Sequence, residues 1–366
     1  MESILANLKS WIVFGAVLSV LIIVHEWGHF ITARKLGVKV ERFSLGFGKK
    51  LFSKIHKGTE YLICAIPLGG YVKLAGDERS ECQGHPWEFF SKPPGHRALV
   101  VLNGPIVNFI FAYICLVLVF FVGYPDLSNK VGQVIDGYPA QEAGLKVNDR
   151  IVEVDGMEIM TFSDLQDSIS TSQGRSIQVK IIRDDREITK IVFPLVEERK
   201  NIFGQTEELR MIGVAPQEEI IAVRHGVIES FVGAFEKLSE IVVTIFKSLY
   251  FMITGSVSPQ KVLTGPIGIF YYVTEAANMG FAHLLLLLGV ISASLATFNL
   301  FPIIPLDGGH LLFLLLEKIH GRSLPEKIEE IVARIGFGLI LLLAVYVFYA
   351  DFARFGLFDK IKDLFS

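Results

Sequence analysis

Cysteine is scarce in this sequence, with only Cys64, Cys82 and Cys115 among 366 residues. No two of them are spaced as C-x-x-C, and Cys115 lies in an apolar run, so neither a disulfide framework nor a structural zinc ribbon is expected. Tracts of Lys and Arg interleaved with aromatic residues are also lacking, and the formal net charge is only −3. Nucleic acid is therefore not an expected partner.

Charged residues are missing altogether from the stretch 11–24, although they make up 20% of the whole chain. A hydrophobic content of 51% and a positive mean hydropathy indicate a mixed architecture, partly embedded in a membrane. Spans of about 20 apolar residues are expected at about 11–33, 98–122, 281–316 and 331–350. The first span lacks a small-residue cleavage pattern and is expected to be retained. The third must break at Pro302 and Pro305.

The first span ends in His25-Glu26-Trp27-Gly28-His29, which fits the pattern H-E-x-x-H. On a helix, positions 25 and 29 project from one face, so two imidazoles can bind one Zn²⁺ while Glu26 flanks it. The pattern alone recurs by chance. Inside a spanning helix, however, each ionisable side chain costs about 2.5–3.5 kcal/mol unless a partner such as a metal compensates. The location therefore favours a hydrolytic zinc site within the membrane.

A third ligand must come from elsewhere, because catalytic zinc usually takes three protein ligands and keeps one open position. Two candidates, Asp307 and His310, lie in the broken third span beside Gly308 and Gly309. Irregular backbone at membrane depth is tolerated only where it is buried or lines a cavity. Spacing alone does not separate the two candidates.

The loops predict the orientation of the chain. Residues 31–97 hold 12 Lys/Arg against 6 Asp/Glu, whereas residues 123–230 hold 12 against 19. The positive first loop is expected on the cytoplasmic side, which places both termini and the acidic segment on the far side.

Three further regions are expected between the spans. Short strands joined by turns are expected at about 40–76, and a β-rich soluble domain at 125–217, where apolar alternation is interrupted by turn signals. The charged residues of 226–256 fall along one side of a helix, and this pattern predicts an amphipathic helix at the membrane interface.

Several motifs together resemble the site-2 protease family of intramembrane zinc metalloproteases, in its bacterial RseP-type branch. They are the first-span H-E-x-x-H, Phe43–Gly48, Pro67–Lys73, Asn103–Phe109, Gly265–Gly268 and the Asn299-x-x-Pro-x-x-Pro-Leu-Asp-Gly-Gly309 segment. The resemblance implies one zinc ion held by His25, His29 and Asp307, with Glu26 as the general base. It also implies that Asn299 helps to hold the substrate backbone. His310 receives no role.

The family resemblance further implies a polytopic α-helical membrane protein with four transmembrane helices, in two parts at 1–122 and 281–366. A re-entrant β-structure lies beside its site. We expect the unwound substrate to add as a strand to an exposed edge formed by Tyr61, Leu62, Ile63, Cys64 and Ala65. Residues 125–217 resemble a PDZ domain, which would be extracytoplasmic and would either bind a peptide or restrict access. Asn103 and Asn108 are expected to serve helix packing.

The predicted function is intramembrane zinc endopeptidase activity in the bacterial inner membrane, with the active site toward the cytoplasmic side. The expected partners are transmembrane proteins or signal peptides as substrates, membrane lipid, and a peptide ligand of the PDZ-like domain. Relatives with two PDZ domains are thought to exclude bulky substrates, whereas only one such unit is evident here. The alternative is a catalytically idle scaffold that captures partners, which the intact Glu26 disfavours.

Overall fold

The computed structural model describes residues 2–172, 176–201, 203–323 and 325–356. Its internal contacts divide the chain into two compact units. Unit 1 comprises residues 1–117, 234–247 and 259–366, and unit 2 comprises residues 118–233 and 248–258.

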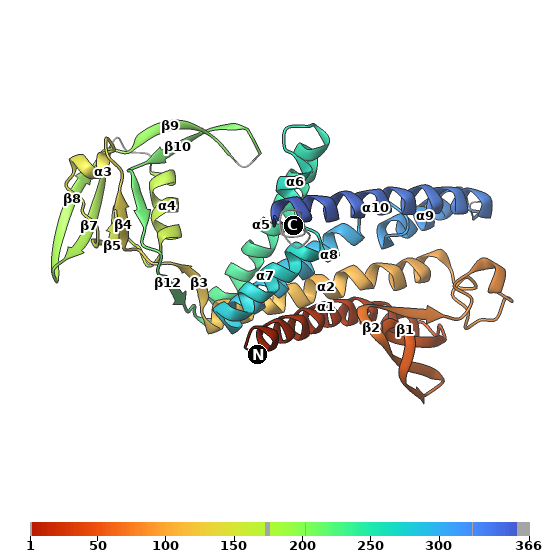
Figure 1. Ribbon diagram of the computed structural model, residues 1–366. Helices are drawn as coiled ribbons and strands as arrows, with labels where there is room; N and C mark the ends of the chain where they lie inside the picture. Colours follow the sequence, from red (N-terminus) through yellow and green to blue (C-terminus); the bar gives the residue numbers. More distant parts are fainter. Residues whose placement is uncertain (1, 173–175, 202, 324, 357–366) are drawn as a thin grey trace, which may run out of the picture. The chain divides into compact units, whose positions relative to one another are not determined.

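Four helices in the described part of the chain are long and apolar enough to cross a membrane. They are α1 (Glu2–Lys35), α2 (Pro94–Val122), α8 (Phe281–Asn299) and α10 (Glu326–Arg354), labelled in Figure 1. The four predicted spans are thereby confirmed as helices. The third is shorter than expected, because the chain leaves the helix before Pro302 and Pro305 and a new helix, α9 (Asp307–His320), follows.

Unit 1 has an apolar core between its helices. Phe14, Val17 and Leu21 of α1 are buried against Val273 of α7 (Pro266–Met279) and against partly buried residues of α8. A short helix, α6 (Pro259–Val262), precedes α7. The packing holds α1, which carries the H-E-x-x-H motif, at a fixed place in the unit.

A buried carboxylate joins α10 to the start of α7. Asp351 is completely buried, and it accepts hydrogen bonds from the N–H groups of Gly265 (3.2 Å) and Gly268 (2.9 Å). The first N–H groups of a helix have no partner within the helix, and a negative charge there is favourable. Asp351 therefore caps α7 from a different helix.

Replacing Asp351 with alanine should destabilise unit 1. The two amide N–H groups would be left buried without an acceptor, at about 1–3 kcal/mol each. Thermal unfolding of the purified protein in detergent should show a clearly lower midpoint for Asp351→Ala. Asp351→Asn keeps one acceptor oxygen and should lose less. An alanine variant as stable as the wild type would contradict the capping role.

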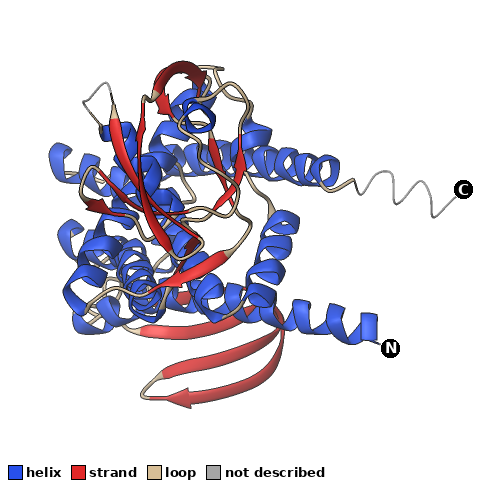
Figure 2. Ribbon diagram, turned by 90° about the vertical axis from the view of Figure 1, so that its left-hand side faces the viewer, coloured by secondary structure: helices blue, strands red, loops and turns tan. Residues whose placement is uncertain are grey.

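Strands β1 (Val40–His56) and β2 (Thr59–Leu74) form one sheet, visible as long red ribbons at the bottom of Figure 2. β1 and β2 each contribute more than one row of paired backbone to this sheet. Residues 42–45 are paired with 70–73 on one side and with 60–63 on the other. Residues 60–64 are also paired with 50–55. The sheet is therefore bounded by the rows 70–74 and 50–56, with 60–64 in its interior.

Unit 2 is rich in strands. A four-stranded sheet has the order β6-β5-β7-β8, and three two-stranded sheets pair β3 with β12, β4 with β11 and β9 with β10. The strands are β3 (Tyr124–Leu127), β4 (Val131–Val134), β5 (Arg150–Val154), β6 (Met157–Glu158), β7 (Ile177–Arg183), β8 (Arg186–Val192), β9 (Leu195–Lys200), β10 (Thr206–Met211), β11 (Val214–Pro216) and β12 (Ile220–Val223). The predicted β-rich region is confirmed.

Two short helices complete the core of unit 2. They are α3 (Pro139–Glu142) and α4 (Phe162–Thr171). The Thr161 side chain and the Asp164 backbone and side chain form a capping box that starts α4. Apolar residues from the strands and both helices fill the core, including Ala140, Ile151, Leu165, Val179 and Ile212.

The segment expected as an amphipathic helix is one continuous helix, α5 (Val227–Ile253). It is not among the four described helices that are apolar enough to cross a membrane. Large apolar side chains such as Ile228, Phe235 and Tyr250 are exposed on it.

Candidate active site

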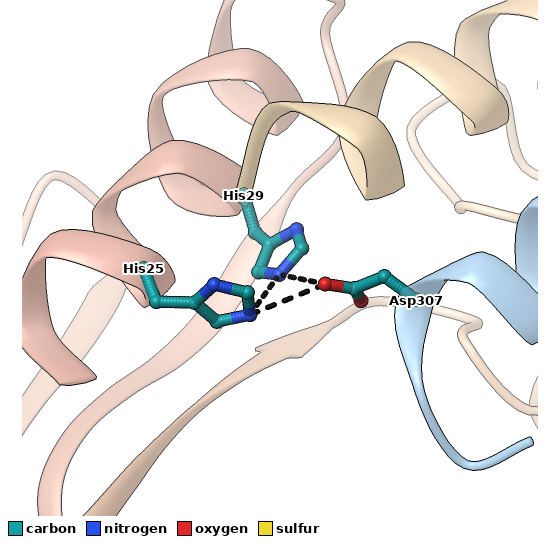
Figure 3. Close-up of side chains that lie close together, drawn as sticks. All are labelled: His25, His29 and Asp307. Carbon is teal, nitrogen blue, oxygen red and sulfur yellow. Dashed lines mark hydrogen bonds and ion pairs between the residues drawn. The ribbon is translucent and has the colours of Figure 1, made fainter. Parts of the chain in front are cut away.

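His25 and His29 lie one turn apart on α1 and point toward Asp307, the first residue of α9 (Figure 3). The Oδ2 atom of Asp307 is 3.2 Å from Nε2 of His25 and 3.6 Å from Nε2 of His29. The two Nε2 atoms are 3.2 Å apart. Segments almost 280 positions apart in the sequence therefore bring three potential metal ligands together.

The chemistry of these three atoms calls for a cation between them. Nδ1–H of His29 donates to the carbonyl oxygen of Val100 (2.9 Å), which leaves a lone pair on Nε2 of the neutral ring. Oδ2 of Asp307 is buried without a hydrogen-bond donor in the described part of the chain. A tetrahedral zinc with bonds of 2.0–2.1 Å has ligands about 3.3 Å apart. The observed separations therefore fit zinc.

Two glycines explain how Asp307 reaches this position. A Cβ atom on Gly308 would lie 2.2 Å from the carbonyl oxygen of Leu300, and one on Gly309 would lie 2.4 Å from the backbone nitrogen of Ile304. Both distances are too short for any side chain. The glycines therefore let the first turn of α9 rest on the broken segment that precedes it, which fixes the Asp307 carboxylate.

Helix α2 covers the two histidine rings from the other side. A Cβ atom on Gly104 would lie 2.4 Å from Nε2 of His29 and 2.9 Å from Cε1 of His25. Gly28 of α1 meets the backbone of Asn103 equally closely, and the Asn103 amide donates to the Gly28 carbonyl (3.0 Å). The helix-packing role predicted for Asn103 is confirmed.

Glu26 lies between the metal ligands and the bounding row of the sheet. Its side chain accepts a hydrogen bond from the Val72 N–H, and a Cβ atom on Gly70 would lie 3.7 Å from its Cγ. The next outward N–H of this row, that of Leu74, donates to the Asp77 carboxylate (3.0 Å). The backbone of residues 70–74 thus faces the site, and the Glu26 side chain lies against it.

A cavity of about 730 Å³ contains the site. Its lining includes Glu26, His29 and Asp307, together with His310 one turn further along α9. His310 is not one of the three clustered residues, so the structure places Asp307, and not His310, beside the two histidines. Asn299 is the last residue of α8 and is absent from the described lining of this cavity.

The cavity wall also carries charged side chains away from the three clustered residues. Arg79 forms two hydrogen bonds with Glu329 of α10 (2.9 and 3.2 Å) and lies over the ring of Phe90. Lys73 hydrogen-bonds to Glu81 (2.8 Å) and is paired with Asp77 (2.9 Å). The hydrogen bonds that Lys73 donates to Glu81 and Asp77 raise the pKa of its ammonium group, so it remains charged at neutral pH.

One expectation about the sheet is wrong. Tyr61, Leu62, Ile63, Cys64 and Ala65 were predicted to present an exposed edge, but residues 60–63 are paired on both sides. Leu62 and Cys64 are also buried. Alternating apolar residues predict a strand, but they do not predict whether that strand lies at the edge or in the interior of the sheet. Here the more glycine-rich segment 69–74 forms the bounding row next to Glu26.

Comparisons with known proteins agree with this geometry. Residues 13–343 match the family model described as Peptidase family M50. A Campylobacter jejuni protein named as a zinc metalloprotease is 36% identical, over 92% of both chains. The regulator of sigma-E protease RseP of Escherichia coli is 31% identical, over 97% of this chain and all of the relative. The latter alignment runs over 461 residues, so parts of RseP have no counterpart here.

One solved structure is similar to a smaller part of the chain. The PDZ domain of an SdrC-like protein from Listeria monocytogenes covers 24% of this chain and 86% of its own, with 20% identity and a TM-score of 0.20.

Proposed function

We infer that this chain, which belongs to peptidase family M50, is a zinc metalloprotease that hydrolyses peptide bonds in or near the membrane-spanning segments of other proteins. The observation that carries the proposal is the meeting of His25, His29 and Asp307 beside Glu26, on helices that include a candidate span. A water-dependent site at such a position would act on peptide bonds that enter the membrane.

Each side chain of the site has a distinct part in the proposed reaction. His25, His29 and Asp307 would hold one zinc ion, which when bound would polarise the scissile carbonyl and lower the pKa of a bound water to about 7. The Glu26 carboxylate takes a proton from the attacking water and passes it to the nitrogen of the leaving amine. The Val72 N–H holds this carboxylate in place through its hydrogen bond.

The substrate backbone requires a partner, because a helix hides its peptide groups in its own hydrogen bonds. We propose that an unwound substrate adds as a strand beside Gly70–Leu74, the bounding row that lines the cavity next to Glu26. This row replaces the Tyr61–Ala65 segment as the proposed docking edge. Asn299 remains a proposed contact on the substrate backbone, supported by the family resemblance.

Photocrosslinking distinguishes docking of the substrate at Gly70–Leu74 from docking at Tyr61–Ala65. With p-benzoylphenylalanine at Tyr71 and Glu26→Gln to retain the substrate, we expect a crosslink to a model transmembrane segment, because Tyr71 belongs to the bounding row. The same probe at Ile63, which is 46% exposed on an interior row, serves as the matched position. A crosslink at Ile63 without one at Tyr71 would contradict docking at Gly70–Leu74.

We propose that residues 125–217 of unit 2 form a single PDZ-like domain on the extracytoplasmic side, where it binds a peptide or restricts access to the site. The acidic balance of residues 123–230 supports that side, and the positive balance of 31–97 supports a cytoplasmic first loop. The membrane would then be the bacterial inner membrane. Within this topology, β1 and β2 form the re-entrant β-structure, and α5 lies at the membrane interface.

The natural substrates are proposed to be membrane proteins or leftover signal peptides. One relative is named a regulator of sigma-E protease, and this suggests the regulation of a sigma factor as one role. Quantitative proteomics of membrane peptides tests the proposal, in cells with the wild type and with Glu26→Gln. Transmembrane fragments or signal peptides that accumulate only with the variant identify the substrates. Identical membrane peptides in both strains would contradict the proposed activity.

A further inference from the structure

Helix α2 presents three consecutive turns to the two histidine rings. The carbonyl oxygen of Val100 accepts from Nδ1 of His29, Gly104 touches both rings, and the side-chain amide of Asn108 lies 3.3 Å from Nδ1 of His25. These positions are four residues apart and share one face of the helix. The Asn108 side chain is completely buried.

The position of Asn108 is itself fixed by α8. The hydroxyl of Ser292, also completely buried, donates to the backbone carbonyl of Asn108 (2.9 Å). This hydrogen bond ties the backbone of α2 at Asn108 to α8, and it does not involve the side-chain amide of Asn108.

The direction of the hydrogen bond between Asn108 and His25 decides the tautomer of the ring. An asparagine amide offers an oxygen on one side and an NH₂ group on the other, and the two are exchanged by a 180° rotation. With NH₂ toward the ring, Nδ1 accepts, and the ring proton lies on Nε2, facing Asp307. With Oδ1 toward the ring, Nδ1–H donates, and Nε2 has a free lone pair.

The surroundings favour the second arrangement. Nε2 of His25 faces Oδ2 of Asp307 and Nε2 of His29, the two other atoms of the candidate zinc site, and a protonated nitrogen there could not bind the ion. The structure places Nδ2 of Asn108 toward Nδ1 of His25 and leaves Oδ1 buried without a partner in the described part of the chain, so no hydrogen bond of Oδ1 opposes the rotation that exchanges the two. His29 already has this tautomer through Val100.

We propose that Asn108 is a positioning residue for His25. Its Oδ1 accepts the Nδ1–H of the ring and thereby directs the Nε2 lone pair to the metal. The inference rests on the proposed zinc site and adds to it a ligand-orienting contact from α2. Contacts of this kind typically change metal affinity by about 10–100-fold when removed.

Zinc affinity of the purified full-length chain, measured by competition with a chromophoric chelator, tests the proposal. Asn108→Leu has a similar size but no acceptor, and should bind zinc about 10–100-fold more weakly than the wild type. Asn108→Asp supplies an oxygen acceptor, and should stay within about threefold of the wild type or bind more tightly. Ser292→Ala loosens the packing around Asn108 without touching its amide, and should also stay within about threefold.

The outcomes separate positioning from simple packing. Weak zinc binding by Asn108→Leu together with near-wild-type binding by Asn108→Asp supports the proposal. If the Leu variant does not fold, near-wild-type zinc affinity of Asn108→Asp supports it by itself. Equal affinity of Asn108→Leu and wild type would overturn it, as would a loss in Asn108→Asp that matches the loss in Asn108→Leu. A wild-type chain that binds no zinc would instead overturn the proposed metal site itself.

Discussion

Glu26→Gln is expected to lower the rate of substrate cleavage by about 10²–10⁴-fold while zinc remains bound. Glutamine keeps the size of the side chain and can still accept the Val72 N–H bond, but it cannot take a proton from water. The three proposed metal ligands are unchanged. Cleavage of a reconstituted transmembrane substrate, measured together with the zinc content of the same preparation, gives both quantities.

The matched control is Glu158→Gln in β6 of unit 2, an exposed residue outside the site. It makes the same chemical change and should leave both the rate and the zinc content as in the wild type. A Glu26→Gln protein that cleaves at the wild-type rate would exclude Glu26 as the base. Loss of zinc from that variant would mean that Glu26 also supports the metal ligands.

Gly104→Ala should be almost as severe, although this position touches no substrate. The added Cβ would lie 2.4 Å from Cε1 and Nε2 of His29, so the rings of both histidines must move. A displacement near 1 Å at a reacting centre can lower the rate by about 10²-fold, and we expect at least that loss of cleavage. Zinc content should fall with it, because the shifted groups are two of the three proposed ligands.

Gly15→Ala on α1 is the control for adding a methyl group to a membrane helix. A Cβ at Gly15 would meet nothing within 4 Å, so this variant should cleave at the wild-type rate. Normal cleavage and full zinc content in Gly104→Ala would contradict the close packing of α2 against the histidine rings.

The metal ligands could be predicted from the sequence because their chemistry is unusual for their surroundings. Two histidines and a glutamate in an apolar run, and an aspartate between prolines and glycines in another, are costly in a membrane without a common partner. Residue types therefore point to His25, Glu26 and His29 and leave Asp307 and His310 as candidates for the third ligand, between which the family resemblance favours Asp307. The break in the third span was equally predictable, since proline cannot continue a helix.

The pairing of the strands could not be predicted in the same way. Tyr61–Ala65 and Tyr71–Leu74 both alternate as strands do, and nothing in their composition says which is interior. That place depends on how β1 pairs with two parts of β2 at once. The contacts of α2 were missed for a similar reason. Val100 acts through its backbone carbonyl, which no residue type encodes, and Asn108 had been expected to serve packing alone.

Cleavage of peptide bonds within the membrane is the activity proposed for this site. Its most direct test is mass spectrometry of the products formed when purified, zinc-loaded protein is reconstituted with a single-span substrate. Two fragments that end inside or next to the apolar segment are expected, and they should be lost when zinc is removed by a chelator. Intact substrate in the presence of one bound zinc per chain, or cleavage confined to its soluble domains, would contradict the account.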